Sequence, residues 1–212
     1  MKKQSSELYW SRFACSYDED GEYVVGKPIL QAIEKILLNE RSLGNAVEFG
    51  CGTGYFTKAI ARNAGHVVAT DLSDEMLDIA HARLKYIENI SIQKADCAGT
   101  SFSEESFDSV FMLNLLHVID DPSRCLRESC RILRKGGFIT VIDFTGSGMK
   151  FINKMKLGFK YLKTWGLPPR QGKDNMSKKE LVYLVENAGF IVKDVQILEY
   201  GANALYLKAE KK

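Results

Sequence analysis

The chain has 212 residues, of which 45% are hydrophobic and 26% charged, and its net charge is +2. This length favours a single domain, 1–212, with a core that needs neither disulfides nor a metal. A net charge this small argues against general nucleic-acid binding. The five cysteines are scattered, and no secretory leader or membrane-spanning apolar run is apparent. We therefore expect a cytoplasmic protein with no metal site.

The first two thirds of the chain alternate between helical and extended patterns. Helical patterns cover 5–20, a stretch beginning at Pro28, then 55–63, Ser73 to about Lys85, and Asp121 to about Lys135. Extended patterns cover 45–49, 66–70, 90–94, 107–113 and 138–144, and the fourth of these is apolar enough to be buried on both faces. Such alternation predicts βαβ units around a parallel sheet.

The tail follows a different pattern. Ser177 and Glu180 form an S-x-x-E capping box before a helix that ends at Gly189. Two strands follow, 190–199 and 202–209, joined by only Tyr200 and Gly201. So tight a link predicts an antiparallel hairpin.

Three glycines alternate in the stretch VEFGCGTGYF, 47–56, between the first strand and a helix. Ligands of doubly wound sheets bind beyond the carboxyl ends of the strands, which is where this turn lies. Glycine adopts positive φ and lets a ligand approach the backbone closely. The alternative is that Gly50, Gly52 and Gly54 only allow close packing of helix against strand.

Polar residues also follow the next three strands. Asp71 ends the second strand, where a carboxylate can accept hydrogen bonds from both hydroxyls of a ribose; the alternative, a helix cap, is better filled by Ser73. Asp96 follows the third strand, within reach of an adenine amino group, or is an ordinary turn aspartate. Asn114 follows the fourth. These positions all lie on the side of the sheet where a nucleotide is expected.

The glycine spacing and one acid indicate which nucleotide. The dinucleotide fingerprint is G-x-G-x-x-G, whereas here the spacing is G-x-G-x-G, with Tyr55 in place of the third glycine. Glu48, just before the turn, would repel a pyrophosphate and suits a cationic group. An adenosine with a cationic amino-acid tail, S-adenosyl-L-methionine, meets these requirements. A nicotinamide-dependent oxidoreductase and a noncatalytic cofactor-binding regulator stay as alternatives.

The motifs together resemble those of the class I S-adenosylmethionine-dependent methyltransferases, in the small-molecule branch that includes the ubiquinone/menaquinone-biosynthesis C-methyltransferases. They are VEFGCGTG (47–54), VVATDLSDEML (67–77), KADC (94–97), FDSVFMLNLLHVIDDP (107–122) and RILRKGGFITVIDF (131–144). The resemblance implies an α/β fold with a doubly wound, seven-stranded, mostly parallel sheet in the order 3-2-1-4-5-7-6. Strand 7 would be antiparallel, and helices would cover both faces. It also implies a helical cap from 1–40 and a cap insertion at 146–176.

Site residues are carried over from the resemblance by position. Asp71 would hold the ribose, Asn114 would contact the methionine part, and Tyr17 is a weaker candidate because FACSYD (13–18) matches its motif imperfectly. The resemblance places Glu48, Gly50, Gly52 and Gly54 in the cofactor turn, Leu72 and Met76 on either side of the adenine, and Asp96 and Cys97 at its edge. Cys51 and Leu115 belong to the same motifs, Tyr55 directly follows the first of them, and all three complete the expected cofactor site.

Methyl transfer to a small-molecule acceptor by in-line displacement needs little from the protein beyond orientation and a dry pocket. A general base is required only where the acceptor must lose a proton. His117 is the candidate, and the alternative is that it merely packs beneath a turn. The acceptor atom (carbon, nitrogen, oxygen, sulfur or arsenic) and the oligomeric state stay open.

The segment 146–173 carries seven basic residues and no acid, which leaves the rest of the chain at −5. A helical wheel places its apolar residues on one side: Phe151, Ile152, Met155, Phe159, Leu162 and Trp165. Three interpretations stay open. The segment is a cap over the substrate, a cap that attracts an anionic substrate, or a helix, 149–165, that makes transient contact with an anionic membrane to collect a lipophilic substrate.

Overall fold

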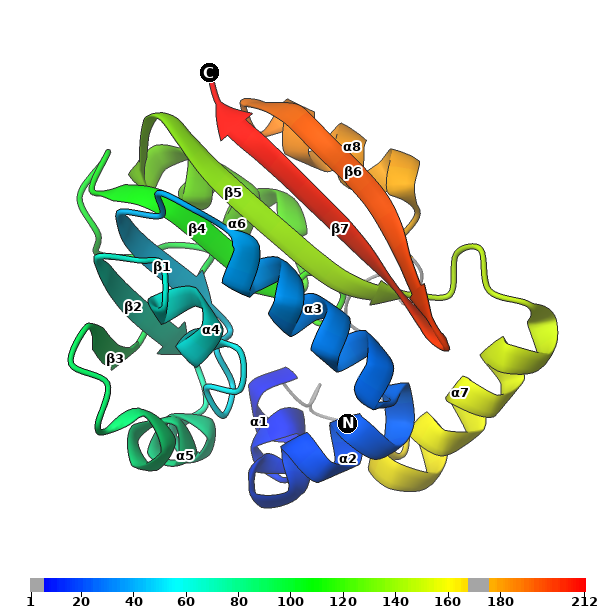
Figure 1. Cartoon of the computed structure of the whole chain (residues 1–212). Helices are drawn as coiled ribbons and strands as arrows, with labels where there is room; N and C mark the ends of the chain where they lie inside the picture. The colour runs from blue at the N-terminus through cyan, green and yellow to red at the C-terminus, as the bar shows by residue number, and fades with distance from the viewer. Residues whose placement is uncertain (1–5, 168–175) are drawn as a thin grey trace.

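A seven-stranded sheet forms the centre of the protein (Figure 1), as described by a computed structural model for residues 6–167 and 176–212. The strands are β1 (Asn45–Phe49), β2 (His66–Asp71), β3 (Ile90–Lys94), β4 (Phe107–Leu113), β5 (Leu133–Thr145), β6 (Phe190–Tyr200) and β7 (Ala202–Lys211). Their order is β3-β2-β1-β4-β5-β7-β6, and β7 runs antiparallel to both of its neighbours. The predicted order, the antiparallel strand 7 and the hairpin are confirmed.

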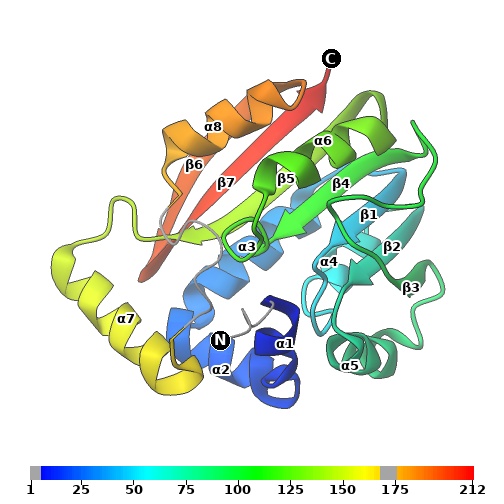
Figure 2. The same cartoon turned by 180° about the vertical axis from the view of Figure 1, so that it is seen from behind.

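Helices cover both faces of the sheet (Figures 1 and 2). The α-helices of the described residues are α1 (Ser6–Ser11), α2 (Tyr17–Val25), α3 (Lys27–Asn39), α4 (Thr57–Ala61), α5 (Asp74–Leu84), α6 (Pro122–Ile132), α7 (Phe151–Trp165) and α8 (Lys178–Asn187). Buried side chains of α6 and α8 pack on one face and those of α3 and α4 on the other. Strand β4 contributes Val110 to the first core and Phe111 to the second, so it is buried on both faces, as predicted.

The helix ends follow the predicted capping residues. Ser73 Oγ accepts from the Met76 N–H at 3.1 Å, and the Asp121 side chain accepts from the Arg124 N–H at 3.0 Å. The capping box of Ser177 opens α8. Because α5 and α6 begin just beyond β2 and β4, these caps fix the loops at the carboxyl ends of the strands.

The prediction of one helix over 5–20 is wrong. The segment is divided into α1, a 3-10 turn at Ala14–Ser16, and α2. The break allows aromatic rings to gather from both sides: the Tyr9 and Phe13 ring centroids lie 5.5 Å apart, and those of Trp10 and Trp165 lie 5.4 Å apart. Aromatic packing against α7 thus replaces a continuous helix.

Two predicted boundaries are also wrong. Helix α4 is shorter than 55–63, and the change from α6 to β5 falls at Leu133 rather than between Lys135 and Phe138. Leu133 already pairs with Phe107, and a register shift follows. At Gly137 a Cβ would lie only 2.9 Å from the Asp108 carbonyl oxygen. The double glycine therefore lets the strand continue through a bulge instead of ending the helix.

Among the described helices, none has both the length and the apolar character needed to cross a bilayer. Arg170 and Lys173 of the basic segment, and the Pro168–Pro169 pair that follows its helix, lie outside the described residues.

Candidate active site

A cavity of about 900 Å³ opens beyond the carboxyl ends of the parallel strands. Its wall includes the loops after β1 to β5, together with α2 and the inner side of α7. His117 and every residue expected to bind the cofactor line it, with the exception of Gly54. The volume is in the range of small-molecule sites and large enough for a nucleoside cofactor.

The three glycines of the turn have different surroundings, although all have positive φ: 69° at Gly50, 53° at Gly52 and 75° at Gly54. A Cβ at Gly50 would lie 2.7 Å from Cδ1 of Leu115, and one at Gly54 would lie 2.7 Å from Cδ1 of Leu84. A Cβ at Gly52 would meet nothing within 4 Å. Gly50 and Gly54 therefore serve close packing, whereas Gly52 leaves the backbone open to the cavity.

Asp71 joins the glycine turn to the loop after β2. Its Oδ2 accepts from the Gly52 N–H at 2.9 Å, and its Oδ1 accepts from the Ser73 N–H at 3.0 Å. Burial raises the pKa of Asp71, and these N–H donors oppose the rise. A carboxylate oxygen has more than one acceptor site, so both oxygens keep capacity for ribose hydroxyls.

Glu48 is a buried acid at the end of β1, with an exposed fraction of 2%. The Thr57 hydroxyl donates to its Oε2 at 2.6 Å. Burial raises the pKa of Glu48 to about 7; the Thr57 hydrogen bond lowers it, and the Asp71 charge adds to the rise. A bound cation would favour the charged carboxylate, so the site is suited to an ammonium group.

Asn114 lies at the end of β4 in a left-handed conformation, with φ of 55°. Its N–H donates to the Ile142 carbonyl at 2.7 Å, which fixes the residue beside the cavity. Its buried Oδ1 has no hydrogen-bond partner among residues 6–167 and 176–212. A buried acceptor without a donor is costly, so this oxygen fits a ligand that brings one. Together with the open space at Gly52, it makes the cavity fit a cofactor with an ammonium tail.

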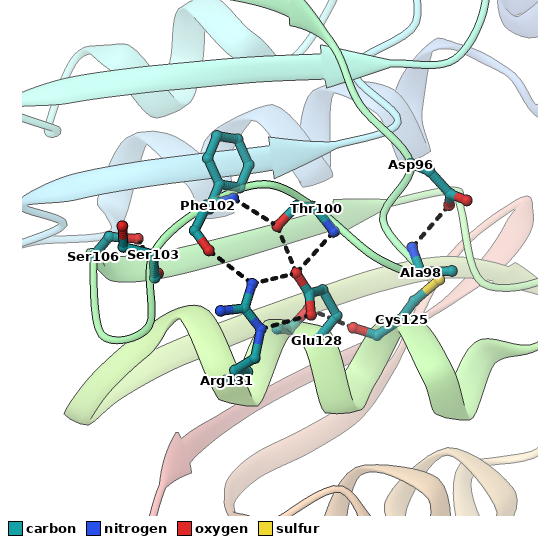
Figure 3. A network of polar contacts seen from close by, with 10 residues as sticks. Asp96, Ala98, Thr100, Phe102, Ser103, Ser106, Cys125, Glu128 and Arg131 are labelled. Carbon is teal, nitrogen blue, oxygen red and sulfur yellow. Dashed lines mark hydrogen bonds and ion pairs between the residues drawn. The ribbon is translucent and has the colours of Figure 1, made fainter.

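The loop that carries Asp96 is fastened to α6 (Figure 3). Asp96 accepts from the Ala98 N–H at 2.8 Å, and Glu128 accepts from the Thr100 N–H at 2.9 Å. Arg131 donates to the Phe102 carbonyl and to Glu128. The Arg131 guanidinium and the Thr100 bonds hold the pKa of Glu128 down at about 2, against a smaller rise from burial. The loop expected to contact the adenine edge is thus held by a charged network, Glu128 with Arg131, that the sequence analysis missed.

Two buried thiols lie at the base of this loop. Cys97 Sγ and Cys125 Sγ are 2.7 Å apart, and both residues line the cavity. The hydrogen bond with Cys125 and burial together raise the pKa of Cys97 far above its usual range. The Cys97 thiol therefore stays protonated and packs as a small apolar group rather than acting as a nucleophile.

His117 is held by Asp143, a residue that the sequence analysis missed. Asp143 is 1% exposed, its Oδ1 pairs with His117 Nδ1, and its Oδ2 accepts from the His117 N–H at 3.0 Å. With the proton of a neutral imidazole on Nδ1, the other nitrogen, Nε2, carries the lone pair. The signal available in the sequence was an acid inside the mostly apolar stretch FITVIDF.

A second missed cluster ties α2 to the glycine turn. The Thr53 hydroxyl donates to Asp18 at 2.6 Å, and Arg83 donates to the Thr53 hydroxyl at 2.8 Å while pairing with Asp18. Asp18 is the neighbour of Tyr17, which lines the cavity. Burial and the carboxylates of Asp71, Asp18 and Asp143 raise the pKa of Tyr17, so its hydroxyl remains a neutral donor.

Comparison with known proteins agrees with this geometry. Residues 47–141 match a family model described as a methyltransferase domain. The demethylmenaquinone methyltransferase of Clavibacter sepedonicus is 32% identical over 99 residues, which is 47% of this chain and 40% of that protein. That of Tropheryma whipplei strain Twist is 27% identical over 177 residues, covering 76% of this chain and 72% of the relative. These matches support a class I S-adenosylmethionine-dependent methyltransferase that is similar to the demethylmenaquinone methyltransferases.

A solved structure supports the same fold for the methyltransferase as a whole. It is a SAM-dependent methyltransferase from Thermotoga maritima, described as a possible histamine N-methyltransferase. The TM-score is 0.77 at 23% identity, with 98% of this chain and all of that chain covered. The cofactor is S-adenosyl-L-methionine, and neither alternative from the sequence analysis, the oxidoreductase or the noncatalytic regulator, gains support.

Proposed function

We propose that this methyltransferase methylates a small hydroxylated aromatic acceptor, with His117 as the general base and Asp143 as the residue that positions it. The observation that carries the proposal is the His117–Asp143 pair on the cavity wall. A held imidazole of this kind suits an acceptor that must lose a proton. Relatives named demethylmenaquinone methyltransferases support an aromatic acceptor of quinone type.

The wall on the side of α2 and α7 suits a flat, apolar molecule. Aromatic side chains of the N-terminal helices and α7 line the cavity there: Trp10, Tyr17, Tyr161 and Trp165. Their ring contacts are mutual, so Trp165 lies 5.0 Å from Tyr161 and stacks on Tyr17 at 6.1 Å between centroids. Such rings offer broad apolar contact to an aromatic acceptor.

The residues that would hold the cofactor are those predicted from the sequence. We assign Asp71 to the ribose, Asp96 to the adenine edge, and Glu48 and Asn114 to the amino-acid tail. Held by these residues, S-adenosylmethionine would supply an activated methyl group on a sulfonium for in-line displacement by the acceptor. The protein brings the two reactants together and excludes water, which supplies most of the required acceleration.

His117 would take the acceptor proton on Nε2. The nearby Asp143 carboxylate would stabilise the imidazolium that results, and its contact with Nδ1 would keep the ring from turning away. Loss of the proton makes a hydroxylated ring electron-rich at oxygen and at the adjacent carbons. Either atom can then attack the methyl group, so the base is compatible with transfer to carbon or oxygen.

The test is a screen of small acceptors with isotope-labelled cofactor, read by mass spectrometry. We expect label in hydroquinones and phenols and little in amines of similar size. His117→Ala should abolish most of the label, and His81→Ala, an exposed histidine on α5, should not. Labelling of amines alone, undiminished in His117→Ala, would overturn the proposal.

The cellular location is a further part of the proposal. All five cysteines are free thiols, which supports a location in the cytoplasm.

A further inference from the structure

The outer side of α7 presents large apolar side chains to solvent. Phe151 is 76% exposed, Ile152 64%, Met155 60% and Phe159 70%. At about 100° per residue these four side chains fall within roughly a third of the helix circumference. We call them the outer stripe. Isolated apolar residues on a surface are ordinary, but a contiguous stripe of four marks a site of interaction.

The opposite side of α7 already has its packing partners. Leu157, Tyr161 and Trp165 pack against Tyr9, Val24 and neighbouring residues of the N-terminal helices. Figures 1 and 2 show α7 at the margin of the molecule, away from the sheet and beside α2. The apolar residues that a helical wheel places together are thus divided, because the outer stripe faces solvent whereas Trp165 packs against the N-terminal helices. That α7 forms a cap over the substrate stays a prediction. The stripe is not needed for the fold.

Lysines surround the outer stripe. Lys150, Lys154, Lys156 and Lys163 are exposed, and α7 contains no acid. None of these four lysines forms an ion pair with an acid in the described parts of the chain. Lys160 differs, because it donates to the Tyr23 carbonyl at 2.8 Å. The surface is therefore apolar along its middle and positive along its edges.

We propose that this surface docks the enzyme on an anionic phospholipid bilayer. Apolar side chains enter the boundary between headgroups and acyl chains, and lysines on either side reach the phosphates, which is how amphipathic basic helices bind membranes. The charge decides against a second copy of this chain as the occupant. Pairing two outer stripes would bring two sets of exposed lysines together with no acid on either helix.

The position of α7 gives the docking a consequence for the cavity. Lys154, Leu157, Gly158 and Leu162 line the cavity from the same helix whose outer side carries the stripe. A bilayer in contact with the stripe would lie one helix diameter from the acceptor. An apolar acceptor dissolved in that bilayer would have a short path to the cavity. The docking itself does not rest on the identity of the acceptor.

The experiment is co-sedimentation of the full chain with vesicles. One set contains phosphatidylcholine alone, and the other contains roughly one third phosphatidylglycerol, enough to give a strongly negative surface. We expect sedimentation with the second set only, and its loss as salt is raised, because screening weakens lysine attraction. Two double variants should each weaken binding by at least about tenfold. One combines Ile152→Gln with Phe159→Gln, and the other combines Lys156→Gln with Lys163→Gln.

Matched variants on α8 provide the control. Lys178→Gln with Lys179→Gln removes two exposed lysines, and Tyr183→Gln removes a side chain that is 68% exposed. These variants should bind vesicles normally, and all variants should keep the circular dichroism and cofactor affinity of the parent. The proposal is overturned if the parent protein does not sediment with anionic vesicles, or if the α8 substitutions reduce vesicle binding as much as the α7 substitutions. A vesicle-free dimer that Phe159→Gln dissociates would likewise overturn it. Methylation of a water-soluble acceptor, measured in parallel, reports the proposed activity separately.

Discussion

Asp143 contacts His117 through both of its oxygens, one at the imidazole Nδ1 and the other at the backbone N–H, 3.0 Å away. The two residues come from adjacent strands, since His117 follows β4 and Asp143 belongs to β5. A side chain held in this way by a 1% exposed carboxylate has one orientation and one neutral tautomer. This geometry supports the proposal that His117 acts as a general base positioned by Asp143.

The first prediction separates the two members of this pair. His117→Ala should lower kcat by roughly 10²–10⁴-fold, the usual contribution of a general base. Asp143→Asn keeps the shape but loses the charge that stabilises the imidazolium, so we expect a smaller fall in kcat and a shift of the pH profile. Cofactor affinity, measured by calorimetry, should stay nearly unchanged in both. A His117→Ala enzyme with full kcat would remove the base from the mechanism.

The second prediction concerns pH and Glu48. The folded protein holds the pKa of Glu48 at about 7, well above its ordinary value of 4.5, so the free enzyme binds more protons than the unfolded chain between these values. This contribution to stability is present below about 4.5 and is lost as pH rises through about 7. The cationic tail of the cofactor favours the carboxylate, so cofactor affinity should rise as pH increases through about 7.

Calorimetry across this range tests the role of Glu48. Binding near pH 6 should release a proton, and affinity should fall by up to about tenfold per pH unit below the pKa. Glu48→Gln should bind more weakly at neutral pH and lose the pH dependence, whereas Glu88→Gln, at an exposed position, should behave as the parent. An affinity that stays constant across the range in the parent would show that Glu48 does not face the cationic tail.

The third prediction distinguishes the glycines of the turn. Gly54→Ala adds strain at positive φ and a clash with Leu84, so it should lower the free energy of unfolding by roughly 2–4 kcal/mol. Gly52→Ala should cost only about 1–2 kcal/mol, because its Cβ has space, but that Cβ enters the cavity and should weaken cofactor binding at least about tenfold. Urea unfolding and calorimetry measure the two effects.

Gly201 provides the control for backbone strain. It has φ of 92° in the β6–β7 turn, and a Cβ there would meet nothing within 4 Å. Gly201→Ala should therefore lower stability without changing cofactor affinity. If Gly52→Ala and Gly201→Ala have the same effect on affinity, the cofactor does not approach the backbone at Gly52.

Local patterns in the sequence were enough to predict much of the fold. The caps at Ser73 and Ser177 and the hairpin at Gly201 depend on neighbouring residues only, and each is confirmed. The break in the N-terminal helix depends instead on Trp165, which is distant in the chain and becomes a neighbour only after folding. Propensity alone therefore favoured a continuous helix.

The same distinction applies to the site. Glu48 and Asp71 are marked by their places at strand ends, where a ligand is expected. The partners of Asp18 and Asp143 could not be predicted in this way, because they lie 35 and 26 residues away along the chain. The contacts of these two acids with Thr53 and His117 exist only once α2 has packed beside the turn and β5 has paired with β4.

The last prediction tests the network beneath the adenine edge. Because the pKa of Glu128 is held near 2, its pairing stabilises the fold above about pH 4.5 and is lost as pH falls toward about 2. Glu128→Gln should lower the free energy of unfolding at neutral pH by about 1–2 kcal/mol, after allowance for solvent screening of the Arg131 pair. It should also weaken cofactor binding a few-fold, because the Thr100 bonds that hold the Asp96 loop are weakened.

Urea unfolding should find parent and variant much closer in stability near pH 3, and Glu186→Gln, an exposed change on α8, should match the parent throughout. If Glu128→Gln lowers stability but leaves cofactor affinity intact, the loop keeps its shape without the network and Asp96 is positioned by its own turn.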